Sequence, residues 1–183
     1  MRVIRAALSG FVFFLTLAPI SNRQAHAADV SLADLRVAAR SLGFLQSGPR
    51  NSGLTIGVVY APGVSESRLL AHQTAERLRA LPGPGDTGLR ADAVALNDVS
   101  NYSGRLDALF VLPGIMADTG VIMDTARRRH LLVMSNDPAC LDQRACMLMV
   151  RDNGRAEIVL DSGLAQSAGV TFSSIFAMMV KRR

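Results

Sequence analysis

The chain has 183 residues, of which 49% are hydrophobic and 19% charged, and its formal net charge is +5. This length suits one domain with a single core. Nucleic-acid binding requires a clustered basic face with aromatic or polar readers beside it. The densest basic runs, Arg127–Arg129 and Lys181–Arg183, are instead typical of solvated helix ends. The charge pattern therefore argues against that class of function.

Residues 1–27 are predicted to be a signal peptide. A basic start precedes the apolar run Ala6–Ile20, and Ala25-His26-Ala27 supplies a small-x-small cleavage site. The apolar run is shorter than the roughly 20 residues of a membrane span, and an uncleaved signal anchor is the alternative. We therefore expect residues 28–183 to form one mature domain in the periplasm. Its net charge falls to +2, because three cations leave with the signal and no acid does: Arg2, Arg5 and Arg23.

Helical and strand patterns alternate through the first two thirds of this domain. Near-continuous apolar runs with β-branched residues are typical of strands buried on both faces. Strands are expected at Leu54–Tyr60, Leu89–Leu96, Leu106–Leu112 and His130–Met134, and helices at Ser31–Leu42, from Ser65 to Leu81, and from Asp118 or Thr119 to about Arg129. This order predicts a single three-layer, Rossmann-like α/β domain with a mostly parallel sheet.

After Cys146 the pattern changes to a β-hairpin. The strands Met147–Arg151 and Arg155–Leu160 flank Asp152-Asn153-Gly154. Asn-Gly is the preferred central pair of a type I′ turn. The predicted sheet therefore ends in an antiparallel pair.

Caps and linkers give further local predictions. Ser31 resembles a helix N-cap with an acid, Asp34, at the third helical position. The loop Pro82–Gly88 is a linker and not a phosphate cradle, because it precedes a strand and lacks a Gly-Lys-Ser/Thr ending. Near the C-terminus we expect a helix capped by Asp161 or Ser162 and stopped by Gly169, then a last helix over Thr171–Val180.

Cys140 and Cys146 are the two cysteines of the sequence and enclose five residues. In an exported chain they are expected to pair. The loop-closure estimate for so small a ring is about 2–2.5 kcal/mol, and the bridge would fix the turn before the predicted strand Ala145–Val150. A redox switch and a metal pair are the alternatives. A metal site needs more ligands, and the mature chain adds only His72 and His130.

No catalytic constellation is recognised. The sequence has no Gly-x-Ser-x-Gly elbow and no His-Glu-x-x-His pair, and we expect no bound metal and no cofactor. His72 and His130 have no catalytic context. Three carboxylates lie near strand ends, where α/β sites gather, but polar residues fall there for other reasons too: Asp107, Asp137 and Asp161. An exported enzyme is therefore the third-ranked function.

Adaptable apolar side chains are concentrated in the last quarter of the chain: Met147, Met149, Phe172, Phe176, Met178 and Met179. Core packing is the default explanation. Methionine-rich surfaces also serve as accommodating partner sites. On that second interpretation the candidate partner-binding residues are Met147, Met149, Asp161, Phe172 and Phe176.

A succession of short segments in the C-terminal part carries a family resemblance: Leu131–Ser135 with Asn136-Asp137-Pro138, Cys140, Cys146-Met147-Leu148, Arg155–Asp161, Ala165–Val170 and Thr171–Phe176. In these segments the chain resembles the YfiR family of periplasmic proteins. The strand Leu106–Leu112 is also similar, so the resemblance covers the chain from about Leu106 to its end. Fainter agreement extends to the Ile56–Tyr60 strand and the first helix.

The resemblance implies a small, often dimeric periplasmic protein. Such a protein binds and represses the periplasmic domain of an inner-membrane diguanylate cyclase, and so regulates cyclic-di-GMP signalling. It also implies that Cys140 and Cys146 form the family's C-terminal disulfide. Two departures concern the partner surface. Phe44–Pro49 replaces the family's aromatic-Trp-Pro segment, and Asp161 replaces an Asn after the last strand.

Two functions follow from these observations. The leading hypothesis is a non-enzymatic regulator or sensor that shifts a membrane signalling protein between inactive and active states. The alternative is a periplasmic small-molecule-binding module. It is suggested by Pro62-Gly63 and Pro113-Gly114, which follow two predicted strands and would frame a cleft at their ends.

Overall fold

The computed structural model describes residues 30–46, 53–115 and 119–183. The predicted signal peptide lies outside these residues. Among the helices of the described ranges, none combines the length and apolar character needed to cross a bilayer.

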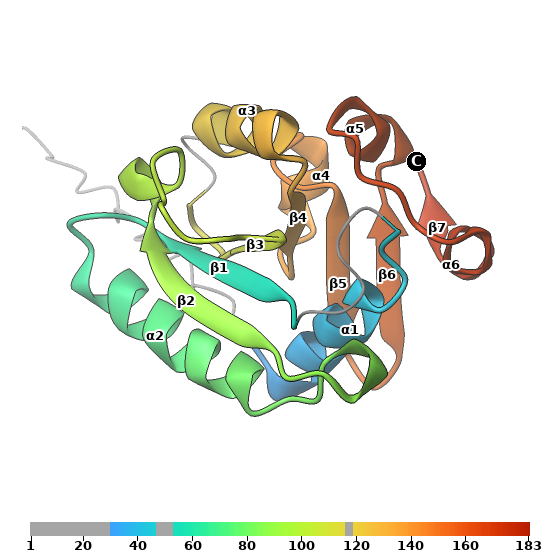
Figure 1. Ribbon diagram of the computed structural model, residues 1–183, viewed down its shortest axis with the longest axis horizontal. Coiled ribbons are helices and arrows are strands. Elements are labelled where there is room, and N and C mark those ends of the chain that lie inside the picture. Colours follow the sequence, from blue (N-terminus) through green and yellow to red (C-terminus); the bar gives the residue numbers. More distant parts are fainter. Residues whose placement is uncertain (1–29, 47–52, 116–118) are drawn as a thin grey trace, which may run out of the picture.

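One seven-stranded sheet organises the described chain, in the order β2-β1-β3-β4-β5-β6-β7 (Figure 1). Strands β1 to β5 pair in parallel, β6 pairs antiparallel with β5, and β7 runs parallel to β6. The strands are β1 Thr55–Tyr60, β2 Arg90–Ala95, β3 Ala108–Val111, β4 Leu132–Ser135, β5 Leu148–Asp152, β6 Ala156–Leu160 and β7 Lys181–Arg182. The predicted mostly parallel sheet with a C-terminal antiparallel pair is confirmed.

Helices cover both faces of the sheet. They are α1 Leu32–Leu42, α2 Ser65–Arg79, α3 Thr119–Arg129, α4 Ala139–Asp142, α5 Ser162–Ser167 and α6 Ser174–Met179. In Figure 1, α1 and α2 lie below the sheet and α3 and α4 lie above it. The central strands β3 and β4 are therefore buried along their whole length, as their apolar sequences require. The predicted three-layer α/β architecture is confirmed.

The hairpin between β5 and β6 forms as expected, but its turn is not type I′. A type I′ turn needs positive φ at both central residues. Here Gly154 has a φ of 85°, whereas Asn153 is not among the residues with positive φ. Asp152 pairs with Ala156, which leaves a three-residue loop. The Asp152 carboxylate accepts a hydrogen bond from the Gly154 N–H at 3.0 Å, and this local turn replaces the predicted one.

The end of the chain also differs from the prediction. The last helix begins at Ser174 and not at Thr171, because the Ser173 hydroxyl caps it by accepting from the Phe176 N–H at 3.3 Å. The segment before it pairs with the chain after α1, where the Ser173 N–H donates to the Phe44 carbonyl at 2.9 Å. Lys181 and Arg182 then add strand β7 to the sheet and do not end a helix.

Asp34 connects α1 to two residues that are distant in the sequence, Asn136 and Asp152. Its carboxylate accepts from the Ser31 N–H at 3.2 Å, which completes the predicted capping box. It also accepts from the Asn136 amide at 3.1 Å and from the Asp152 N–H at 2.7 Å. The residue is only 4% exposed. A buried carboxylate is tolerated only where donors surround it, and Asp34 has three.

We predict that Asp34→Asn destabilises the fold by roughly 2–3 kcal/mol, because the new amide nitrogen meets donors and leaves them unpaired. Ser31→Ala removes only the local cap and should cost about 1 kcal/mol. Urea unfolding followed by circular dichroism gives both values. If Asp34→Asn costs no more than Ser31→Ala, the long-range bonds of Asp34 contribute nothing.

Candidate functional site

A cavity of about 470 Å³ opens at the carboxyl ends of β1 and β3. Its lining comes from the loop after β1, the first half of α2 and the loop after β3. The lining residues are Ala61, Val64, Glu66, Ser67, Leu69, Leu70, Gln73, Leu112, Pro113, Gly114 and Ile115. We refer to this cavity as the strand-end cleft.

The strand order places the cleft there. β1 and β3 are neighbours in the sheet, but their connections leave in opposite directions. α2 leads from β1 to β2 at one edge, whereas α3 leads from β3 to β4 on the other side. Where neighbouring connections diverge, nothing fills the space above the strand ends, and ligands of open α/β sheets bind at such switch points.

The two loops of the cleft depend on their Pro-Gly pairs. Gly63 has a φ of 81° and Gly114 a φ of 86°, a conformation that favours glycine. The loop after β1 is further fixed because the Ser67 hydroxyl accepts from the Ala61 N–H at 3.0 Å. Pro113 and Gly114 line the cleft, as the sequence hypothesis proposed. Pro62 and Gly63 belong to the loop between the lining residues Ala61 and Val64 but do not line the cleft themselves.

The wall of the cleft is mainly apolar. Leu69 is 59% exposed and Val64 is 50% exposed, and both line the opening with the half-buried Leu70. Helix α2 is anchored by a different stripe, Ala71, Ala75 and Leu78, which is buried at the helical spacing of four and three residues. The predicted helix from Ser65 to Leu81 did not distinguish the exposed Leu69 from this buried stripe.

The polar groups of the cleft come from helix α2, most of them from its first turn. The N-cap residue is Val64, whose side chain cannot accept a hydrogen bond, so the first turn has no side-chain cap. The backbone N–H groups of this first turn and the positive end of the helix dipole suit an anionic group. Glu66 and Gln73 line the same cavity and can receive or share a cationic or amide group.

The predicted disulfide joins Cys140 to Cys146, with Cα atoms 5.4 Å apart. Both cysteines are fully buried. Between them the Ala145 N–H donates to the Cys140 carbonyl at 2.7 Å, and Met147 beyond the bridge donates to Val133 at 2.9 Å. The bridge thus closes the turn from α4 into the start of β5, as the sequence suggested.

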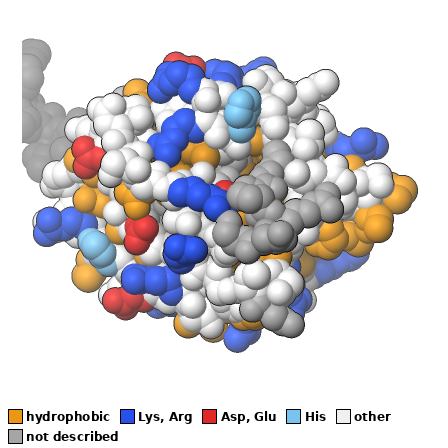
Figure 2. All heavy atoms as spheres, viewed as in Figure 1, with side chains coloured by type: hydrophobic (Ala, Val, Ile, Leu, Met, Phe, Trp, Pro, Cys, Tyr) orange, Lys and Arg blue, Asp and Glu red, His pale blue; other side chains and the backbone are white. Residues whose placement is uncertain are grey.

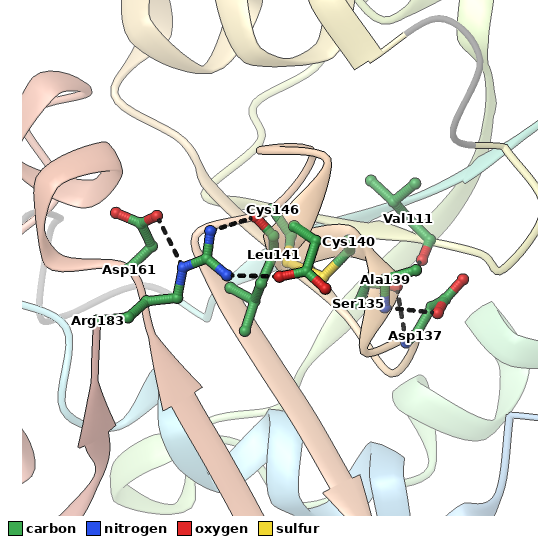
Figure 3. Close-up of a disulfide and its surroundings, with 10 residues drawn as sticks. Val111, Ser135, Asp137, Ala139, Cys140, Leu141, Cys146, Asp161 and Arg183 are labelled. Atoms are coloured by element: carbon green, nitrogen blue, oxygen red, sulfur yellow. Dashed lines mark hydrogen bonds and ion pairs between the residues drawn. A yellow bond between two sulfur atoms is a disulfide. The ribbon is translucent and has the colours of Figure 1, made fainter.

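Arg183 ties the C-terminal residues to this disulfide turn (Figure 3). Its guanidinium donates to the Leu141 carbonyl at 2.7 Å and to the Asp142 carboxylate at 2.9 Å. It also lies 3.5 Å from the Asp161 carboxylate, which caps α5 by accepting from the Leu164 N–H at 2.9 Å. Asp161 therefore has a structural role in this fold.

The predicted partner-binding residues do not share one surface. Met147, Met149 and Phe176 are buried, because the sheet packs the two methionines inside and Phe176 stacks between two rings. Its ring centroid lies 5.0 Å from that of Phe44 and 4.7 Å from that of Phe172. Phe172 and Asp161 are half-buried. The structure therefore places three of the five candidates in the core.

The two histidines of the described residues, His72 and His130, are not brought together. His72 is exposed on α2. His130 follows α3 with a φ of 55°, a left-handed helix end. Its Nδ1 lies 3.0 Å from the Ala168 carbonyl, and because a carbonyl only accepts, that nitrogen carries the proton. His130 thus fixes α3 to the chain after α5.

The three strand-end aspartates are likewise separate, and each accepts from a nearby backbone N–H: Asp107 from Thr55, Asp137 from Ala139 and Asp161 from Leu164. Within the described ranges, no three His, Cys, Asp or Glu residues form a group that could hold a metal ion.

Comparison with known proteins gives likeness of fold. No protein-family model and no curated protein matches this sequence. A substrate-binding protein with adhesive properties from Clostridium difficile, solved in its ligand-free, open form, has a TM-score of 0.51 and 11% identity, over 71% of this chain and 54% of that one. The ABC domain in complex with L-Trp from Streptococcus pneumonia has a TM-score of 0.54 and 13% identity, over 82% of this chain and 59% of that one.

At such identities the likeness shows the fold alone. This chain also matches little more than half the length of either structure.

We predict that removing the disulfide by Cys140→Ala with Cys146→Ala lowers the free energy of unfolding by about 2–2.5 kcal/mol, the loop-closure value for so short a ring. Thermal and urea unfolding with and without reductant measure the loss. Thiol titration of the wild-type protein, denatured without reductant, should find no free thiol. Two free thiols would contradict the pairing.

Proposed function

We propose that this chain is a small-molecule-binding module whose ligand occupies the strand-end cleft. The observation that carries the proposal is the cavity of about 470 Å³ at the β1–β3 switch point, the expected ligand position in this sheet order. Its described lining includes one ionisable side chain, Glu66. A single carboxylate offers no acid–base pair, so we propose binding and not catalysis.

The lining favours a ligand of amino-acid size. The uncapped first turn of α2 suits a carboxylate, and Glu66 suits an ammonium group. Leu69, Leu70 and Ile115 provide an apolar wall for a side group. A zwitterion with an apolar side chain matches all three features at once. The ligand named for the Streptococcus structure, L-Trp, is of this class.

The two fold neighbours also support the proposal, because one is described as a substrate-binding protein and the other is in complex with a small molecule. Both are much longer than the region matched by this chain.

The buried disulfide supports the expected export, because disulfides persist in oxidising compartments.

We predict that the protein shows ligand-dependent thermal shifts with apolar L-amino acids, tested from L-Trp through the aliphatic series. Leu69→Asn should weaken that binding about ten-fold, because it removes an apolar contact. The control is Ile175→Asn, which replaces an aliphatic side chain of matching exposure, 60% against 59%, on α6. Isothermal titration calorimetry measures both affinities.

Glu66→Gln separates the ammonium contact from the rest of the site. It should weaken binding of an amino acid but leave binding of its deaminated analogue unchanged. No thermal shift with any amino acid, or equal losses for Leu69→Asn and Ile175→Asn, would contradict the proposed site.

We propose regulation of an inner-membrane signalling protein, such as a diguanylate cyclase, as a second function. It is supported by the resemblance to the YfiR family and by the half-buried Asp161, which lies 3.5 Å from the Arg183 guanidinium beside the disulfide turn. Affinity capture from periplasm-exposed membranes should then recover such a signalling protein. Recovery of none, with the folded chain as bait, counts against regulation while leaving the cleft proposal intact.

A further inference from the structure

Helix α6 presents a cluster of exposed apolar side chains that the rest of the described chain leaves uncovered. Ile175 is 60% exposed, Met178 78% and Met179 61%. The helix itself is held firmly, because Phe176 on its other side is buried between Phe44 and Phe172. Figure 2 shows hydrophobic side chains gathered over α6 at the right-hand edge of the molecule. We call these three residues the α6 tip.

A basic groove of about 510 Å³ adjoins the α6 tip. Met179 belongs to both, and the groove is otherwise lined by the β5–β6 hairpin and β7: Arg151, Asn153, Arg155, Ala156, Glu157, Ile158 and Lys181. The charged lining is three cations and one carboxylate. Lys181 donates to Glu157 at 2.6 Å, and this hydrogen bond lowers the pKa of the Glu157 carboxyl. Two arginines are in excess.

We propose that the α6 tip and the basic groove dock this protein on an anionic membrane surface. Ile175, Met178 and Met179 would enter the interface between headgroups and acyl chains. Arg151 and Arg155, the two cations in excess, would contact lipid phosphates. This is the division of labour seen in interfacial anchors, where apolar burial and attraction to anionic lipids act together.

The geometry favours a lipid surface over other occupants. The α6 tip projects from the molecule, and a fluid interface accommodates a projecting apolar group. A second copy meeting this face through a two-fold axis would oppose its own cations. Lys181 and Arg182 also lie on the edge strand β7, where charged residues discourage strand pairing between copies.

The test uses the full chain and sonicated vesicles of phosphatidylcholine alone or mixed equally with phosphatidylglycerol, separated by centrifugation. Binding should be at least ten-fold stronger to the anionic vesicles and should weaken with salt. Met178→Ser with Met179→Ser, and separately Arg151→Gln with Arg155→Gln, should each lower the partition coefficient about ten-fold. Circular dichroism melts establish that each variant folds.

Matched controls carry the same changes elsewhere on the surface. Leu32→Ser with Val121→Ser removes exposed apolar side chains from α1 and α3, and Arg36→Gln with Arg90→Gln removes two exposed charges. Neither should change vesicle binding. The proposal is overturned by equal binding to neutral vesicles, by no vesicle binding, or by controls that lose as much as the tip variants. A concentration-dependent dimer abolished by the tip variants, without vesicle binding, would also overturn it.

Discussion

The buried carboxylate of Asp34 joins the N-terminal helix α1 to the ends of β4 and β5. Without its hydrogen bonds to Asn136 and Asp152, α1 would contact the sheet only through apolar side chains, which specify position poorly. With them, α1 is fixed beneath β5. α1 packs in turn against α2, and the Arg77 guanidinium of α2 donates to the Val30 carbonyl at 3.2 Å. Asp34 thus acts on the C-terminal part of α2, whereas the first half of α2, which is one wall of the strand-end cleft, belongs to a helix that packs mainly on β1 and β2.

The disulfide turn solves a second problem, the short connection between the parallel strands β4 and β5. β5 begins level with the end of β4, where Met134 pairs with Leu148. The chain must therefore turn sharply, and α4 has only four residues in which to do it. Arg144 accepts a left-handed conformation in that turn, with a φ of 53°. The cross-link between Cys140 and Cys146 lowers the conformational entropy of this segment in the unfolded state. This stabilisation offsets the cost of the left-handed conformation at Arg144.

Local patterns in the sequence predicted most of the fold because each element carries its own signal. The strand runs, the Ser31 cap and the Asp161 cap all depend on neighbours within four residues. The sequence could not predict contacts made across the chain. Asp34 looked like a local cap, and its partners at Asn136 and Asp152 lie more than a hundred positions away. For Met147 the sequence left core packing, the default, beside a partner surface, because composition does not reveal which strands are covered on both faces; the structure buries Met147.

Local sequence patterns predicted the loops of the cleft but not which side chains of α2 face it. Pro-Gly pairs marked the loops correctly, since a positive φ is a local requirement. The exposure of Leu69 followed only once the buried stripe of α2 was known. Sequence periodicity gave apolar positions on that helix, but not which of them the sheet would cover. Residues that depart from the buried stripe are therefore the better guide to a binding wall.

The sheet order keeps the two proposed surfaces independent. β3, beside the cleft, and β7, beside the α6 tip, are separated by β4, β5 and β6. At about 4.8 Å between neighbouring strands, the two sites lie on the order of 20 Å apart across the sheet. A protein docked through its α6 edge would thus keep the strand-end cleft open to solute. Docking would confine the binding module to the membrane surface without occupying the site that binds.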